Sequence, residues 1–281
     1  MAEYTIRKIP FFDPVKIAIS GQAFRFKILD EDHVELVAMG SYLQIAKLDE
    51  DSFAFSAKGS DFDKIWAPYF HLDFDYQAAV DSIDEDDKYL RSAAEFSRGI
   101  RILRQDSWET LISFIISQRR SIPSIMTSVE RLCEFTGHEA KMPKHLDRPF
   151  VKPSKEVYYA FPARDEMADM SLEDIQGLGV GYRADYIRSA IDYDPDLKAW
   201  ENLSDDDLYA ALTGLRGVGK KVADCVMLFA FARFGRFPVD VWMQRIQDNY
   251  YNGSFDISRY PDTAGIMQQF MFFYERMNKI I

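Results

Sequence analysis

Gly214–Cys225 reads Gly-Leu-Arg-Gly-Val-Gly-Lys-Lys-Val-Ala-Asp-Cys, and Phe237–Asp240, which reads Phe-Pro-Val-Asp, follows it closely. Gly217 and Gly219 indicate a tight turn whose backbone amides can approach a phosphate, and the helix expected after it adds the positive end of its dipole. Lys221 falls in the first turn of that helix. The helix field and partial burial both disfavour an ammonium there, which favours a nucleophilic amine.

Asp240 is the carboxylate that follows this helix closely, and the fixed φ of Pro238 helps to orient it. Taken singly, Lys221 also fits a solvated helix lysine, and Asp240 also fits the N-cap of a helix expected over residues 241–251. Capping and catalysis are compatible, because a cap keeps a carboxylate ionised and fixed. A phosphate-binding hairpin, an amine and a carboxylate together suggest chemistry on a nucleic acid sugar.

Gly214, Gly219 and Lys220 also fit a nucleotide-binding P-loop, over the first seven positions of that motif, Gly214–Lys220. That motif needs Ser or Thr next, to hold magnesium, and a β-strand before it. Here Lys221 occupies the hydroxyl position. The preceding segment, residues 204–212, begins with the capping pattern Ser-Asp-Asp-Asp and predicts a helix. The sequence therefore disfavours an ATP site.

Hydrophobic periodicity predicts an α+β fold. The 281 residues are 47% apolar and 15% aromatic, enough for a substantial core. Short alternating segments predict an antiparallel sheet, with strands expected at residues 15–19, 23–29, 34–39, 42–48 and 52–57. Beyond residue 86 helices are expected at 108–117, 122–136, 171–177, 220–233, 241–251 and 262–277, with a long loop over 137–158. We expect an N-terminal antiparallel β-sheet domain, residues 1–85, and a mostly α-helical body, residues 86–281.

Cysteine and histidine are scarce. The two cysteines, Cys133 and Cys225, lie far apart in sequence, which favours a reduced protein of the cytoplasm. Two thiolates cannot hold an iron–sulfur cluster, and the four scattered histidines suggest no metal site, so no cofactor is expected. The chain shows no N-terminal secretory segment and no run of 18 apolar residues, so we expect neither secretion nor membrane spanning.

The formal net charge of −11 opposes nucleic acid binding, because phosphate contacts need clustered basic side chains. Much of the acidity lies in short runs, among them Asp81–Asp87 and Asp205–Asp207, which we interpret as solvated surface. Residues 211–246 instead carry a local charge of +4, from Arg216, Lys220, Lys221, Arg233, Arg236 and Arg245 against Asp224 and Asp240. An acidic body with a basic face can still bind DNA.

Six blocks resemble, in order, those of the 8-oxoguanine DNA glycosylases of the bacterial type. The first is the hairpin and aspartate loop quoted above, which is similar to that family's helix-hairpin-helix (about residues 204–233) and catalytic aspartate loop. The other five run across nearly the whole chain: Ser20–Phe26, Gly99–Asp106, Ser128–Cys133, Leu178–Ala184 and Ala264–Phe272.

The resemblance implies a base-excision repair enzyme that flips 8-oxoguanine out of duplex DNA. It makes Lys221 the nucleophile that displaces the base, forms a Schiff base and nicks the strand by β-elimination, with Asp240 assisting. It also implies a base pocket. Cys225 and Phe272 would stack on opposite faces of the base, Gln268 would bind its Watson–Crick edge, and the Gly21 carbonyl would accept a hydrogen bond from N7–H, which guanine lacks.

Further residues are assigned to DNA contacts by the same resemblance. Gly217, Gly219 and Lys220 would hold a phosphate at the hairpin. Tyr182 would enter the base stack and Arg183 would bind the orphaned partner base. The family usually has several asparagines where this chain has Gln118–Ser121, so Arg119 or Arg120 would fill the vacated position. Trp242 replaces a histidine that contacts a phosphate, and Ser124 replaces a second arginine near the partner base.

Three functions compete at this stage. The first is a bifunctional 8-oxoguanine glycosylase and apurinic or apyrimidinic site lyase, acting as a monomer in the cytoplasm, on the nucleoid of a bacterium. The second is a glycosylase for alkylated bases on the same fold, which would lack the lysine. The third is a non-catalytic helix-hairpin-helix DNA-binding module. Lys221 argues against the second, and its joint presence with Asp240, Gln268 and Phe272 argues against the third.

Overall fold

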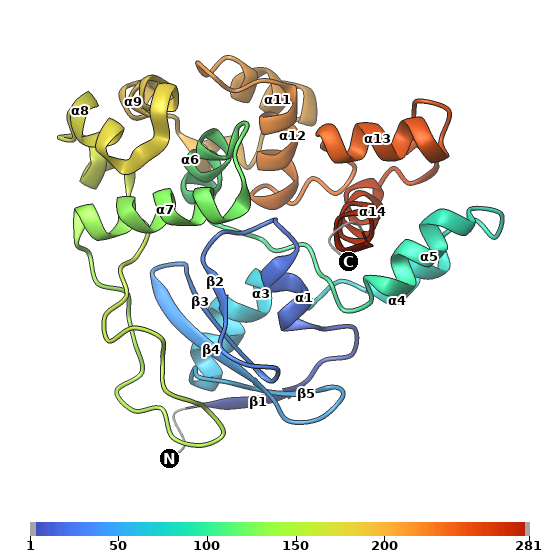
Figure 1. Cartoon of the computed structure of the whole chain (residues 1–281), viewed down its shortest axis with the longest axis horizontal. Coiled ribbons are helices and arrows are strands. Elements are labelled where there is room, and N and C mark those ends of the chain that lie inside the picture. The colour runs from blue at the N-terminus through green and yellow to red at the C-terminus, as the bar shows by residue number, and fades with distance from the viewer. Residues whose placement is uncertain (1–3, 279–281) are drawn as a thin grey trace.

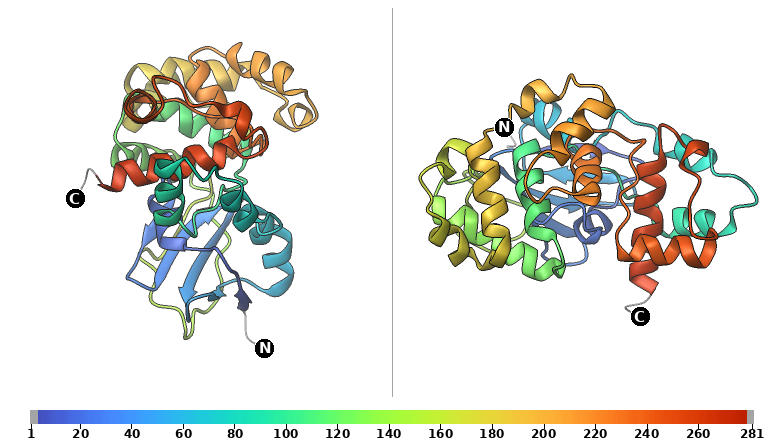
Figure 2. Two further views of the ribbon diagram at one scale, coloured as in Figure 1. Left: turned by 90° about the vertical axis from the view of Figure 1, so that its right-hand side faces the viewer. Right: turned by 90° about the horizontal axis from the view of Figure 1, so that it is seen from above.

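A computed structural model describes residues 4–278 and places a five-stranded sheet at one end of the molecule and helices at the other (Figure 1; Figure 2, left). The sheet order is β1-β5-β4-β3-β2, and every neighbouring pair is antiparallel. The strands are β1 (Thr5–Lys8), β2 (Phe26–Ile28), β3 (His33–Ala38), β4 (Ser41–Lys47) and β5 (Ser52–Phe55). The predicted α+β fold, with the sheet first, is confirmed.

Helices make up most of the remaining chain. The α-helices are α1 (Pro14–Ile19), α2 (Gly59–Asp61), α3 (Ala67–Tyr69), α4 (Tyr76–Asp81), α5 (Lys88–Phe96), α6 (Ser107–Ser117), α7 (Ile122–Thr136), α8 (Leu172–Ile175), α9 (Ala184–Tyr193), α10 (Leu197–Trp200), α11 (Asp205–Thr213), α12 (Lys220–Phe229), α13 (Val241–Tyr250) and α14 (Ala264–Asn278). Single π-helical turns lie at Phe62–Trp66 and Gln176–Val180, and 3₁₀ turns at Arg164–Met167, Gly181–Arg183 and Ile257–Arg259.

Both faces of the sheet are covered. On one face, aromatic side chains from the helices that follow β5, including Trp66 and Phe70, pack with Leu36 and Phe55. On the other face runs the irregular segment 137–163. Buried Glu35 of β3 accepts hydrogen bonds from the hydroxyl of Tyr158 at 2.8 Å and fixes this segment to the sheet. The loop expected over 137–158 is therefore irregular, as predicted, but it also completes the burial of the sheet.

The prediction of a strand at residues 15–19 is wrong. Residues 15–19 form helix α1, because Asp13 caps it by accepting a hydrogen bond from the amide of Lys16 at 2.9 Å, and Pro14 occupies its first turn. Within residues 1–85, where an antiparallel β-sheet domain is expected, most of the segment 59–81 is helical. The helix expected over 220–233 ends at Phe229, and Ala232 then adopts a left-handed backbone with φ of 52°.

The sheet and the helical body share side chains. Leu103 lies in the hydrophobic core beneath the sheet, whereas Phe11 and Phe24 belong to the core of the helical body. Arg101 strengthens the junction by donating from Nε to the carbonyl oxygen of Phe11 at 2.9 Å. The division into domains at residue 85 stays a prediction.

His71 gives the fold a testable pH dependence. Its ring stacks on Phe234 with centroids 4.5 Å apart, and its Nδ1 pairs with the Tyr76 hydroxyl at 3.1 Å. Burial lowers the pKa of His71 to about 4, with the charge of Arg104 acting in the same direction. Between pH about 6.5 and about 4, the unfolded chain therefore binds a proton at His71 that the folded chain does not bind. The contribution of neutral His71 to the free energy of unfolding is complete above pH about 6.5 and is lost as the pH falls toward 4.

We therefore expect the stability of the wild-type protein relative to His71→Gln to decrease from pH 7 to pH 4.5. Urea unfolding of both proteins at several pH values measures the difference. The carboxylates titrate alike in the wild type and in His71→Gln. A difference in the free energy of unfolding of the two proteins that stays constant from pH 7 to pH 4.5 would therefore contradict the prediction.

Candidate active site

The turn between α11 and α12 uses its two glycines differently. Gly217 has a φ of 84°, and a Cβ there would lie 2.3 Å from the ring of Tyr186, so packing requires glycine. Its carbonyl oxygen accepts a hydrogen bond from Gln118 Nε2 at 3.0 Å. Gly219 is the N-cap of α12, and no atom lies within 4 Å of its Cβ position. One glycine fixes the turn, and the other leaves its backbone open to solvent.

Lys221 and Lys220 face different surroundings, although they are neighbours in α12. The Nζ of Lys221 lies 4.9 Å from the centroid of the Phe114 ring, and its side chain is partly buried. Burial raises the pKa of the Cys225 thiol, while the charge of Lys221 and its hydrogen bond to the thiol oppose that shift. Lys220 is largely exposed, and its Nζ pairs with Asp224 at 3.3 Å. Lys221 is therefore the amine with aromatic and thiol neighbours.

Asp240 is held in one orientation. Its Oδ1 accepts hydrogen bonds from the backbone amides of Trp242 and Met243, both at 2.9 Å, so it caps α13. Its charge also raises the pKa of Cys225, which places the carboxylate near the same thiol that Lys221 contacts. The carboxylate thus remains partly exposed while two amides and the helix dipole fix it.

A cavity of about 1180 Å³ lies where α6, α7, α12, α13 and α14 meet the segment after α1. Its walls include nine of the residues named from sequence: Lys221, Asp240, Gly21, Phe272, Gly219, Lys220, Arg119, Arg120 and Trp242. The lysine and the aspartate therefore open onto the same space, with aromatic rings beside them.

Five predicted residues do not line this cavity. Cys225 and Gln268 are buried behind its wall, and Gln268 Nε2 donates to the carbonyl oxygen of Pro238 at 3.2 Å. Tyr182 is half exposed, whereas Arg183 is buried and donates to the carbonyl oxygens of Val180 (3.0 Å) and Gln118. Gly217 packs behind the turn.

Sequence reasoning missed two important wall residues. Phe114 lies in the apolar run of α6, where nothing distinguished it from ordinary core. Arg276 follows Phe272 by four residues, as Phe272 follows Gln268, so helical spacing is the signal that would have placed it on the same face.

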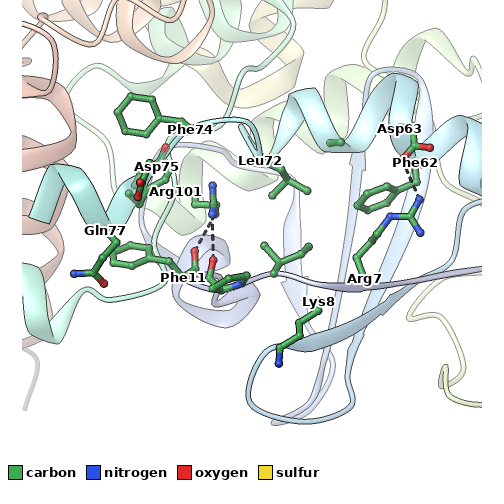
Figure 3. Close-up of a pocket in the computed structure, with 14 residues that line it drawn as sticks. Arg7, Lys8, Phe11, Phe62, Asp63, Leu72, Phe74, Asp75, Gln77 and Arg101 are labelled. Carbon is green, nitrogen blue, oxygen red and sulfur yellow. Dashed lines mark hydrogen bonds and ion pairs between the residues drawn. The ribbon is translucent and has the colours of Figure 1, made fainter.

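A second cavity, of about 520 Å³, lies between the sheet and α4 (Figure 3). Its arginines are already engaged. Arg101 donates to the carbonyl oxygens of Phe11, Pro10 and His71, and Arg7 pairs with Asp63 at 3.0 Å. This cavity presents no comparable set of reactive groups.

Within residues 4–278, no cluster of three or more histidine, cysteine or acidic side chains has the arrangement of a metal site. No helix in that range is long and apolar enough to cross a membrane.

Comparisons with known proteins find DNA glycosylases. A family model for the N-terminal domain of 8-oxoguanine DNA glycosylase matches residues 7–111. A probable N-glycosylase/DNA lyase of Methanothermobacter thermautotrophicus is 29% identical over 233 residues, which cover 75% of this chain and 74% of the relative.

Among the solved structures that match nearly the whole chain are two that each cover 99% of it and 97% of the matched chain. MBOgg1, solved with a low-affinity DNA ligand, is 32% identical with a TM-score of 0.89. The 8-oxoguanine glycosylase/lyase of Clostridium acetobutylicum, solved with double-stranded DNA containing cytosine opposite 8-oxoG, is 28% identical, also with a TM-score of 0.89.

The two turn glycines make a matched pair of variants. Gly217→Ala combines a left-handed backbone with a clash against Tyr186, so it should destabilise the protein by about 1–3 kcal/mol. Gly219→Ala meets no neighbour and should unfold like the wild type, yet its methyl group should hinder a phosphate and weaken duplex DNA binding. Thermal unfolding and duplex titration measure both effects. Wild-type DNA affinity in Gly219→Ala would contradict the role given to this turn.

Proposed function

The chain belongs to the 8-oxoguanine DNA glycosylase family, and we propose that it excises 8-oxoguanine from double-stranded DNA and cleaves the strand as a lyase. The observation that carries this proposal is the joint presence of Lys221 and Asp240 on one large cavity with aromatic walls. A glycosylase for alkylated bases would need no amine at the start of α12, so Lys221 favours the lyase.

Lys221 acts as the nucleophile in this proposal. Its uncharged Nζ attacks the anomeric carbon of the sugar as the bond to the base breaks, and the base leaves with a proton. Ring opening then gives a Schiff base between the sugar and the lysine. Loss of a proton from the adjacent sugar carbon expels the 3′ phosphate and nicks the strand. Asp240, fixed by its two amides, stabilises the positive charge that develops on the sugar.

Recognition of the base uses the opposite wall. The flipped base stacks on Phe272, and the carbonyl oxygen of Gly21 accepts a hydrogen bond from N7–H of the lesion but faces a lone pair in guanine. Gln268 retains a buried Oε1 that has no hydrogen-bond partner within residues 4–278, and an amide with a spare acceptor suits N1–H of the base. Since Gln268 and Cys225 lie behind the wall, the base reaches them as the wall side chains move.

DNA binding follows from the groups at the rim. The exposed amide of Gly219 and the side chain of Lys220 bind a phosphate, with Trp242 beside them. Tyr182, which is already 52% exposed, enters the base stack, and Arg119 occupies the vacated position. Two free, buried cysteines fit a protein that works in the cytoplasm, where we propose that it acts on the nucleoid as a monomer without an iron–sulfur cluster.

Lys221→Gln should reduce both base excision and borohydride trapping to background while leaving binding to lesion DNA nearly intact, because only the attacking amine is lost. Lys220→Gln is the matched control for the amine: it loses a phosphate contact, so it is assayed at saturating protein concentration, where it should still trap because its Nζ pairs with Asp224 and is not the nucleophile. Incubation of each variant with an 8-oxoguanine duplex and borohydride, followed by gel analysis, decides between them. Efficient trapping by Lys221→Gln would mean that another amine is the nucleophile.

A second prediction concerns the base opposite the lesion. Arg183 supplies one planar donor group for cytosine, but Ser124 is too short to supply a second. Arg120 does not replace it in this structure, because its Nε donates to Ser124 Oγ at 3.0 Å and its Nη1 to Ser128 Oγ at 2.9 Å. Losing one such contact removes about 1–3 kcal/mol of discrimination.

We therefore expect 8-oxoguanine to be excised opposite adenine or thymine at rates approaching those opposite cytosine. Single-turnover excision on four duplexes that differ only in the opposite base tests this expectation. A cytosine preference of several hundredfold or more would refute it.

A further inference from the structure

Arg276, near the end of α14, has an unused hydrogen-bond donor. Its Nη2 donates to the carbonyl oxygen of Ile19 at 2.7 Å, and its guanidinium carbon lies 5.8 Å from the centroid of the Phe272 ring. Its Nη1 is buried and has no hydrogen-bond partner within residues 4–278. A buried donor without a partner costs free energy, so this arrangement suits a group that gains its acceptor from a ligand.

The charge of Arg276 is also uncompensated. Burial lowers its pKa, and no nearby charge within the described chain contributes to that shift. Other inward-facing arginines differ: Arg25 pairs with Glu130 at 2.9 Å, and Arg101 donates to three backbone carbonyl oxygens. Arg25 also has a buried Nη1 without a partner within residues 4–278, but it does not line the cavity, and its charge is paired. Arg276 differs in that its unused donor and its uncompensated charge lie on the cavity.

The unused donor lies beside Gly21. A Cβ on Gly21 would stand 3.1 Å from Arg276 Nη1, 3.3 Å from Ile122 Cδ1 and 3.4 Å from Phe272 Cε1. Gly21, Phe272 and Arg276 all line the cavity of about 1180 Å³. A cation, an aromatic ring and the backbone of Gly21 therefore converge on one part of its wall.

We propose that Arg276 is a specificity-determining residue that donates from Nη1 to a keto oxygen beside N7 of the flipped base. This inference rests on the proposed function. In 8-oxoguanine two keto oxygens, O6 and O8, flank N7–H. A base that stacks on Phe272 and donates N7–H to Gly21 brings one of these oxygens to the guanidinium. Arginine has five N–H donors and no acceptor, so it can hydrogen-bond to a keto oxygen at that position but not to an amino group.

The test compares Arg276→Met with the wild type on two substrates. Single-turnover excision of 8-oxoguanine should fall by about tenfold to a hundredfold, the usual effect of losing one charged hydrogen bond. Lyase activity on a duplex with a preformed abasic site, which carries no base, should not change, and this also shows that the variant is folded. Arg98→Met is the matched control, because Arg98 likewise covers an aromatic ring, that of Phe11 at 5.2 Å, but lies outside the cavity.

Binding measurements then identify the oxygen. In a Lys221→Gln background, the effect of Arg276→Met on affinity is measured for duplexes containing 8-oxoguanine, 8-oxoadenine or an abasic analogue. 8-Oxoadenine has O8 but carries an amino group in place of O6. If Arg276→Met weakens the binding of both oxidised bases, the contact is to O8; if it weakens the binding of 8-oxoguanine alone, the contact is to O6. No change on either base, or equal weakening on the abasic analogue, overturns the proposal. If the wild type itself does not excise 8-oxoguanine, the proposed function fails instead.

Discussion

The arrangement of the cavity depends on a close contact at Gly265, in the first turn of α14. A Cβ on Gly265 would lie 2.4 Å from Leu228 Cδ1 of α12 and 2.8 Å from the carbonyl oxygen of Arg236, so a larger residue would displace α14. The amide of Gly265 also donates to the carbonyl oxygen of Phe234 at 2.8 Å. One glycine thus sets the distance between the helix that carries Lys221 and the helix that carries the aromatic wall.

The same arrangement resolves the conflict between the net charge of −11 and the binding of an anion. The side chains that line the cavity include one acid, Asp240, against five bases: Arg119, Arg120, Lys220, Lys221 and Arg276. A concentrated positive potential in a cavity with low-dielectric walls attracts a phosphate backbone even when the rest of the surface repels it. Total charge therefore says little about the ligand, whereas the charge of the side chains that line the cavity does.

Sequence alone predicted the parts of the site that depend on local chemistry. The glycine turn, the first-turn lysine and the capping aspartate each follow from short-range rules, and all three lie where those rules put them. Residues 15–19 were misassigned because apolar alternation outweighed the capping signal of Asp13 and Pro14. Arg276 was missed because its role depends on packing against Gly21, 255 positions earlier in the chain. Spacing can place a residue on a helix face but cannot show what that face contacts.

Hydrogen bonds in the DNA-free structure link two parts of the site that are separate in sequence. Arg183 donates to the carbonyl oxygen of Gln118, and the side chain of Gln118 donates to the carbonyl oxygen of Gly217 at 3.0 Å. Rotation of Arg183 toward a partner base breaks the first of these bonds. The carbonyl oxygen of Gln118 then lacks a donor. Gln118 is also the residue whose side chain donates to the turn at Gly217. The contact that we propose between Arg183 and the opposite strand would in this way be coupled to the turn before Lys221, without direct contact between the two.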